Sequence, residues 1–199
     1  SHGWADVCRQ LLANAHFTEA LATAGDDGNT AFHDAAARGN TDVCDMFLRH
    51  GTTALWLKKN AWGKNALYVA AEAGHADVCS AIVEVLHETG ADAALSTLFE
   101  ATAAGSEFTV LHAAAKGGHV AACKVLCDCP LYTEAMMRRT SAGGKSQLHS
   151  AAQHGRAEVC ALLCAHPRFD VFEVAKDGED GWTPLHWAAS RKQHGACAA

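Results

Sequence analysis

The sequence has no long hydrophobic run and no excess of positive charge. Charged residues or histidine interrupt every apolar stretch before the roughly 20 residues that a membrane-spanning helix requires. The chain has 199 residues, with 16 Lys and Arg against 22 Asp and Glu, which gives a net charge of -6. This balance supplies no basic stripe of the kind that neutralises a phosphate backbone. We therefore expect neither membrane insertion nor a nucleic-acid partner.

A secretory signal and a disulfide framework are also missing. Residues 1–6 contain no basic segment followed by an apolar core. Cysteines number nine, which is odd, and 49% of the residues are apolar, so a chain of this length can build a core without disulfides. We expect reduced thiols and an intracellular protein, located in the cytoplasm or alternatively in the nucleus.

One pattern of residues recurs along the whole chain. It consists of a large apolar residue, an aromatic residue or histidine, two alanines, a glycine and a cysteine. The leading apolar residues are Phe32, Leu67, Leu111, Leu148 and Leu185, with spacings of 35, 44, 37 and 37. Twelve residues after each comes Cys44, Cys79, Cys123, Cys160 or Cys197, and Cys8 precedes Cys44 by 36 residues. Six of nine cysteines thus share one position, which indicates a repeated structural unit.

Each unit predicts two antiparallel helices. A residue able to cap a helix N-terminus stands two positions before each leading apolar residue. These residues are Thr30, Asn65, Thr109, Ser146 and Thr183. Five residues before the cysteine comes Gly39, Gly74, Gly118 or Gly155, a residue suited to the left-handed conformation that ends a helix. Apolar residues then follow with helical spacing, which predicts a second helix with one buried stripe.

Residues 180–189 read Asp-Gly-Trp-Thr-Pro-Leu-His-Trp-Ala-Ala, which resembles the ankyrin repeat signature, and weaker copies start at Gly28, Gly63, Glu107 and Gly144. The resemblance implies an all-α ankyrin-repeat solenoid, a single domain over residues 1–199 with finger loops and about six repeats. We place the repeats at 1–26, 27–61, 62–104, 105–142, 143–179 and 180–199, with the first and last incomplete. The chain therefore starts and stops within a repeat, so we expect a fragment of a longer array or of a multidomain protein.

The resemblance also implies roles for residues. His33, His112, His149 and His186 follow the leading apolar residues, where the family's histidine binds the backbone of a neighbouring finger; the remaining copy has Tyr68. No nucleophile recurs beside these histidines, so we expect no enzyme and no cofactor. The family's function is protein binding through the concave face of the fingers and first helices.

The units depart from the family in length, since they exceed its roughly 33 residues. The extra residues follow the second helix. There we expect an added helical turn that packs an aromatic residue under the loop at 17–21, 132–136 and 169–172, and a short helix within 91–104 around Leu95, Leu98 and Phe99. Lys192 replaces the glycine that ends the first helix in the last unit.

A zinc site is the main chemical alternative. His119, Cys123 and Cys127 share one helix face and Cys129 lies just beyond, a set of four ligands that suits tetrahedral zinc. However, Cys123 occupies the recurring cysteine position, and Cys127 aligns with leucine or valine elsewhere, which favours packing. A metal-sensing or redox-sensing protein that uses these four residues is the corresponding alternative function.

Candidate contacts with a partner are the outward positions that differ between repeats. They lie in the fingers and just after the alanine pairs. The set is Asn29, Arg38, Trp62, Lys64, Glu72, Phe108, Lys116, Lys145, Gln153, Trp182, Ser190 and Arg191. Trp62 and Trp182 are the predicted anchors, and the alternative is that the finger aromatics only pack against one another. We favour a protein-interaction module of a larger protein over a regulatory or substrate-recruiting domain fused to an enzyme.

Overall fold

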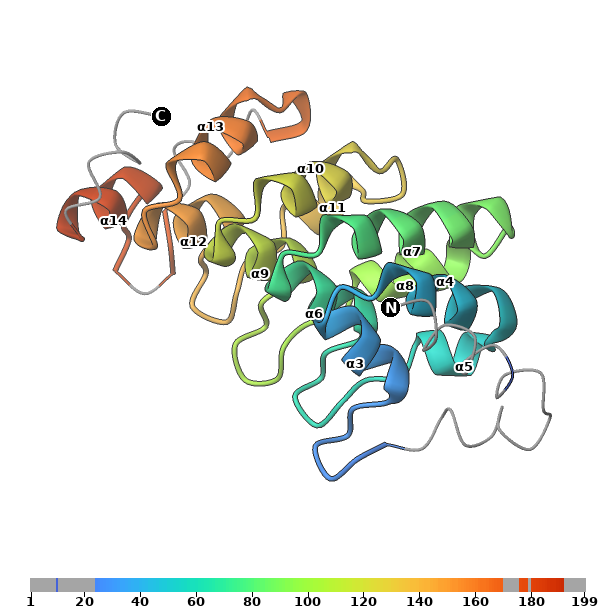
Figure 1. Cartoon of the computed structure of the whole chain (residues 1–199). Coiled ribbons are helices and arrows are strands. Elements are labelled where there is room, and N and C mark those ends of the chain that lie inside the picture. Colours follow the sequence, from blue (N-terminus) through green and yellow to red (C-terminus); the bar gives the residue numbers. More distant parts are fainter. Residues whose placement is uncertain (1–9, 11–23, 170–175, 179, 192–199) are drawn as a thin grey trace.

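A computed structural model of the chain describes residue 10 and residues 24–169, 176–178 and 180–191 (Figure 1). The regular elements in these ranges are helices, and one isolated bridge pairs Thr102 with Thr109. No helix in the described ranges combines the length and apolar character that crossing a membrane requires. The mostly helical architecture predicted from the repeated pattern is confirmed.

The helices form two rows (Figure 1). The first row, which we call the inner helices, contains α3 (Ala31–Ala37), α6 (Ala66–Ala73), α9 (Val110–Gly117), α12 (Gln147–Gln153) and α14 (Pro184–Ser190). The second row, the outer helices, contains α4 (Thr41–His50), α7 (Ala76–Glu88), α10 (Val120–Asp128) and α13 (Ala157–Ala165). Each helix contacts its successor in the same row, and each outer helix contacts the inner helix that precedes it. The chain is thus a stack of helical hairpins.

The ends of the inner helices lie where the sequence predicts them. All five predicted capping residues are N-caps, and the Asn65 side chain accepts a hydrogen bond from the Tyr68 N–H at 2.8 Å. Beyond the C-terminal ends, Gly39, Gly74, Gly118 and Gly155 have φ angles of 69, 84, 86 and 67°. This left-handed conformation favours glycine, because it has no Cβ.

The recurring cysteines lie in the core between the rows. Cys44, Cys79 and Cys123 are 0% exposed and Cys160 is 3% exposed. Burial raises the pKa of Cys44 and Cys79 to about 12, so these thiols stay protonated. They therefore act as small apolar side chains, as expected. Cys8 and Cys197 lie outside the described residues.

Short helices follow the outer helices, as the extra length of the repeats predicts. Helix α8 (Asp92–Phe99) is the short helix expected within 91–104, and it buries Leu95, Leu98 and Phe99. Helix α11 (Glu134–Met137) realises the turn expected at 132–136, with Thr133 as its N-cap. The buried Tyr132 ring packs edge-on against Phe99, with the two ring centroids 5.1 Å apart.

Two further turns complete this series. The 3-10 helix η1 (Pro167–Phe169) buries Phe169, while residues 170–172 of the expected turn, and the turn expected at 17–21, lie outside the described residues. Helix α5 (Thr53–Trp56) was not predicted. Its Trp56 indole is buried and donates a hydrogen bond to the Phe47 carbonyl at 3.1 Å, which closes the end of α4. Lys192 also lies outside the described residues.

Candidate functional site

The fingers are the loops that precede the inner helices, and they are tied to one another. Each described finger is closed by a backbone hydrogen bond, in which the N–H of its first residue donates to the carbonyl of its last. The donor and acceptor residues are Gly25 and Asn29, Asn60 and Lys64, Ala103 and Phe108, Ser141 and Lys145, and Asp177 and Trp182. Each finger after the first also donates one N–H to a carbonyl of the preceding finger. The donor and acceptor pairs are Ala61 and Asp27, Ala104 and Trp62, Ala142 and Ser106, and Gly178 and Gly143, at 3.1, 2.8, 3.0 and 3.1 Å. The fingers therefore form one continuous row of fixed backbone.

Histidines connect each inner helix to the next finger. The Nε2 atoms of His33, His112 and His149 lie 3.0, 2.9 and 2.9 Å from carbonyl oxygens of the following finger. These contacts assign the proton to Nε2, and Nδ1 then accepts from the N-cap hydroxyl. Burial lowers the pKa of His33, and lowers that of His112 to about 4, so both are neutral at pH 7. The expected structural role is confirmed for these three; His186 makes the N-cap contact with Thr183 at 2.7 Å.

A second set of side chains ties the other ends of the inner helices together. His75, His119 and Arg156 directly follow the helix-ending glycines. They donate to the carbonyls of Ala37, Glu72 and Lys116 in the preceding repeat at 3.0, 3.1 and 3.0 Å. Sequence reasoning missed these bonds, although the shared offset from the glycine was a signal for them.

The residues proposed for a zinc site do not come together. Among the described residues, no three His, Cys, Asp or Glu side chains are placed to hold a metal ion. His119 instead binds the Glu72 carbonyl, and Cys123 and Cys127 are buried in the core. Burial raises the pKa of Cys127 to about 12, so this thiol is protonated within the core. The zinc and redox alternatives therefore lack the ligand cluster on which they depend.

A shallow groove of about 240 Å³ crosses three repeats on the side of the inner helices. Its lining consists of Tyr68, Glu72, Phe108, Ala113, Lys116, Gly117, His154 and Arg156. This volume is smaller than the about 300–1,000 Å³ of typical small-molecule sites, so the groove suits a side chain of a partner better than a cofactor. The Phe108 ring stacks on His112, with an interplanar angle of 6° and a centroid distance of 5.4 Å.

A second cluster surrounds Trp187 of α14. The Trp182 ring lies 5.0 Å from it, the Lys145 ammonium lies 4.2 Å above its ring, and the Arg191 guanidinium lies at 6.0 Å. The indole Nε1 donates to Oδ2 of the buried Asp177 at 2.6 Å. Sequence reasoning did not single out Trp187, which fixes the positions of three predicted contact residues.

Comparison with protein families decides the classification. The family model described as ankyrin repeats matches residues 1–97, 81–173 and 139–199, so its three copies together cover the chain. The chain belongs to the ankyrin-repeat family. A comparison with curated proteins finds no match. Ankyrin repeats in general bind other proteins and are typically not enzymes, and their stacking creates an extended binding surface.

Several predicted contact residues of this ankyrin array meet at the groove. Glu72, Phe108 and Lys116 line it. Lys64 reaches it from the adjoining finger, with its Nζ 2.6 Å from Glu72 Oε2 and 5.3 Å from the Tyr68 ring centroid. Residues of two repeats are thus brought together. Whether they contact a partner stays a prediction.

The remaining predicted contacts are spread along the ankyrin array. Asn29 joins two fingers, because its amide oxygen accepts from Asn60 Nδ2 at 2.8 Å. The Ser190 hydroxyl donates to the Trp187 carbonyl at 3.0 Å. Arg38 caps the C-terminus of α3, and Gln153 ends α12; neither lines the groove. Trp62 is the exposed large apolar side chain of the predicted set, with 52% of its surface exposed.

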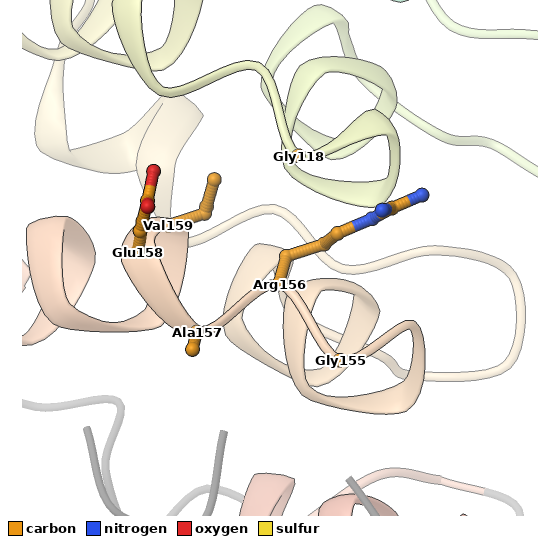
Figure 2. A pocket seen from close by; sticks show the side chains of 6 residues that line it. All are labelled: Gly118, Gly155, Arg156, Ala157, Glu158 and Val159. Atoms are coloured by element: carbon orange, nitrogen blue, oxygen red, sulfur yellow. The ribbon is translucent and has the colours of Figure 1, made fainter. Parts of the chain in front are cut away.

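A neighbouring cleft of about 280 Å³ lies where α12 connects to α13 (Figure 2). Arg156 borders both this cleft and the groove, and its side chain extends toward Gly118. Glu158 also lines the cleft, but its carboxylate lies away from the Arg156 guanidinium (Figure 2). The charge of Arg156 is therefore not neutralised from within the cleft.

Proposed function

We propose that the chain binds a partner protein through its inner face, which consists of the fingers and the inner helices. The positions there that differ between repeats include Lys64, Glu72, Phe108 and Lys116, and these side chains gather around one groove. A fixed scaffold with variable surface positions is the arrangement by which repeat proteins bind partners.

The observation that carries this proposal is the exposed Trp62 side chain. Among the described residues, Trp62 and Leu185 are the two large apolar side chains that are exposed, at 52% and 59%. The Trp62 backbone is held on both sides, because its N–H donates to Asn60 Oδ1 at 3.0 Å and its carbonyl accepts from the Ala104 N–H at 2.8 Å. A tryptophan on a fixed backbone has only its side chain left to order on binding, and tryptophan is a frequent interface hot spot.

Affinity capture with a Trp62→Ala variant tests the proposal. Truncating a hot-spot tryptophan costs about 2 kcal/mol or more of binding free energy, so recovery of the partner should fall at least about tenfold. Because the side chain is exposed, the free energy of unfolding should change by no more than about 0.5 kcal/mol. The measurement is quantitative mass spectrometry of proteins captured from lysate, with circular dichroism to record the thermal midpoint.

A matched variant on the other row of helices provides the control. Lys124 lies on α10 with 67% of its side chain exposed, so Lys124→Ala should leave the captured proteins unchanged. If Trp62→Ala and Phe108→Ala both retain every protein that the unmodified chain captures, the inner face is not the binding surface and the proposal fails.

Two finer expectations stay predictions. A regulatory or substrate-recruiting domain fused to an enzyme concerns residues outside this sequence, and no contact described above favours it. An intracellular location is in keeping with the seven described cysteines, all of which are free thiols.

A further inference from the structure

Charge is distributed unevenly between the outer helices and the predicted contact positions. The outer helices carry seven carboxylates and two cations: Asp42, Asp45, Asp77, Glu84, Glu88, Asp128 and Glu158 against Arg49 and Lys124. The twelve predicted contact positions carry the opposite balance, with Arg38, Lys64, Lys116, Lys145 and Arg191 against the single carboxylate of Glu72. One further carboxylate on the inner helices, Asp34, lies on α3 away from the groove. Thus, in a chain with a net charge of -6, the predicted contact positions carry mostly cations, whereas carboxylates lie elsewhere on the fingers and inner helices.

The cations at the groove are not neutralised by the described part of the chain. Glu72, the carboxylate of the groove lining, is already paired with Lys64 at 2.6 Å. The Lys116 ammonium lies 5.8 Å over the Phe108 ring, and among the described residues it has no carboxylate within ion-pair distance. Arg156 uses its Nε to bind the Lys116 carbonyl, and it too forms no ion pair within the described ranges. Two cations therefore flank an aromatic surface.

We propose that this groove binds a short acidic segment of the partner protein. An apolar side chain of the segment packs on Phe108 and Ala113, and its carboxylates bind Lys116 and the terminal nitrogens of Arg156. Guanidinium groups bind carboxylates well because they present parallel N–H donors. The inference rests on the proposed function and adds the chemistry of the partner.

The length of the segment follows from the spacing of the helices. The groove reaches from α6 across α9 to His154 and Arg156, which follow α12, so it spans about two steps between neighbouring inner helices. Packed helices lie about 8–10 Å apart, so the groove spans about 16–20 Å. An extended chain covers about 3.3 Å per residue, so a segment of five or six residues is long enough to cross the groove while one of its side chains enters it.

A long polyanion such as nucleic acid fits this surface less well. The fingers of the repeats on either side of the groove carry exposed carboxylates on Asp26, Asp27 and Asp180. These groups repel phosphates that extend past the groove, whereas a segment of about six residues stays between the cations. The overall negative charge acts in the same direction.

Selection from a displayed library of random 12-residue peptides on the full 199-residue chain tests the inference. Enriched peptides should carry at least two Asp or Glu residues and one apolar residue within six positions. The most enriched peptide is then synthesised with a fluorescent label, and its Kd is measured by anisotropy. Lys116→Glu should raise the Kd at least about tenfold, since attraction becomes repulsion, and Lys116→Gln should raise it about threefold.

Lys124→Glu is the matched control, because it makes the same charge change in the same repeat on an outer helix. It should leave the Kd within about twofold. Thermal midpoints of all variants show whether each one is folded.

The outcomes separate this inference from the proposed function. Two results would overturn the inference and leave the inner face as the binding surface. In both, the enriched peptides lose binding to the Phe108→Ala variant. They either lack acidic residues or bind the Lys116→Glu variant with an unchanged Kd. Peptides that respond to no inner-face substitution overturn both. An oligo-dT probe that binds with the same Lys116 dependence, while no acidic peptide is enriched, also overturns the inference.

Discussion

The hydrogen bond between Asp177 and Trp187 gives a sharp prediction about stability. Asp177 is 5% exposed, and its Oδ1 accepts from the N–H groups of Asp180 and Trp182 at 3.1 and 2.9 Å. Its Oδ2 accepts from Trp187 Nε1 at 2.6 Å. In Asp177→Asn the amide oxygen can keep the two backbone donors. The amide nitrogen then faces the indole N–H, so two donors meet.

The expected loss is that of a charge-assisted hydrogen bond with its donor left unpaired. Such a loss costs about 2–3 kcal/mol. For a chain of this length each kcal/mol lowers the thermal midpoint by about 2–4 °C, so Asp177→Asn should lower it by about 4–12 °C. Because repeats unfold as neighbouring units, the effect should be concentrated in the repeat that contains α14.

Protonation of Asp177 should have the same effect as the substitution. Burial alone would raise the pKa of Asp177, but the hydrogen bonds from Trp187, Trp182 and Asp180 lower it more, so the pKa lies below its ordinary value. A lowered carboxyl pKa contributes stability above the ordinary pKa of about 3.9, and this contribution disappears as the pH falls through the folded-state pKa. The difference between the unmodified chain and Asp177→Asn should therefore be full at pH 7 and shrink below about pH 4.

Thermal melts of the two single variants and the double variant Asp177→Asn with Trp187→Phe measure the interaction directly. The coupling energy of this double-mutant cycle should be about 1.5–3 kcal/mol. A coupling near zero, or a thermal midpoint for Asp177→Asn equal to that of the unmodified chain, would refute the reasoning. An amide at the corresponding place of an earlier finger causes no such conflict. There Asn60 Oδ1 accepts from two finger N–H groups, while Asn60 Nδ2 donates to the amide oxygen of Asn29.

Two more substitutions test the stack. Gly74→Ala should destabilise the chain by about 2–3 kcal/mol in urea unfolding, since φ is 84° and a Cβ would collide with the His119 ring. Gly105 is the control, because its φ is 80° but a Cβ there would meet no other atom, so Gly105→Ala should cost only about 1 kcal/mol. Equal losses would show that the His119 contact is unimportant. Burial lowers the pKa of His112 to about 4, so the unfolded chain binds more protons than the folded chain between pH 6.5 and 4. The free energy of unfolding should therefore fall as the pH is lowered through that range. His112→Gln should flatten this fall in urea midpoints, and an unchanged slope would contradict the assignment.

The features that the sequence predicted well are those repeated in every hairpin. Capping residues, helix-ending glycines and buried cysteines depend on neighbours within one repeat or at the same position of the next one. The histidines also recur at one position, and the family resemblance implied their bonds to the fingers. Periodicity reveals such features because each copy is an independent observation of the same contact.

The features that it did not predict depend on single contacts between repeats. The packing of Trp182 against Trp187, which Lys145 and Asp177 hold from two sides, was not predicted, and the anchor role of Trp182 stays a prediction. Helix α5 lacks the leading aromatic residue of the turns expected at 17–21, 132–136 and 169–172, and it forms where the Trp56 indole reaches the Phe47 carbonyl. The groove combines residues from three repeats, and no local pattern relates them.

Because the histidines bind main-chain oxygens, the contacts that hold the stack together do not depend on the side chains available to a partner. His33, His112 and His149 bind the carbonyl oxygens of Lys64, Lys145 and Trp182. Across the five fingers, this position carries asparagine, lysine, phenylalanine, lysine and tryptophan. A main-chain oxygen is the same whichever amino acid carries it. Evolution or a protein engineer can therefore exchange the residue at this position for a new target without loosening the joint beneath it.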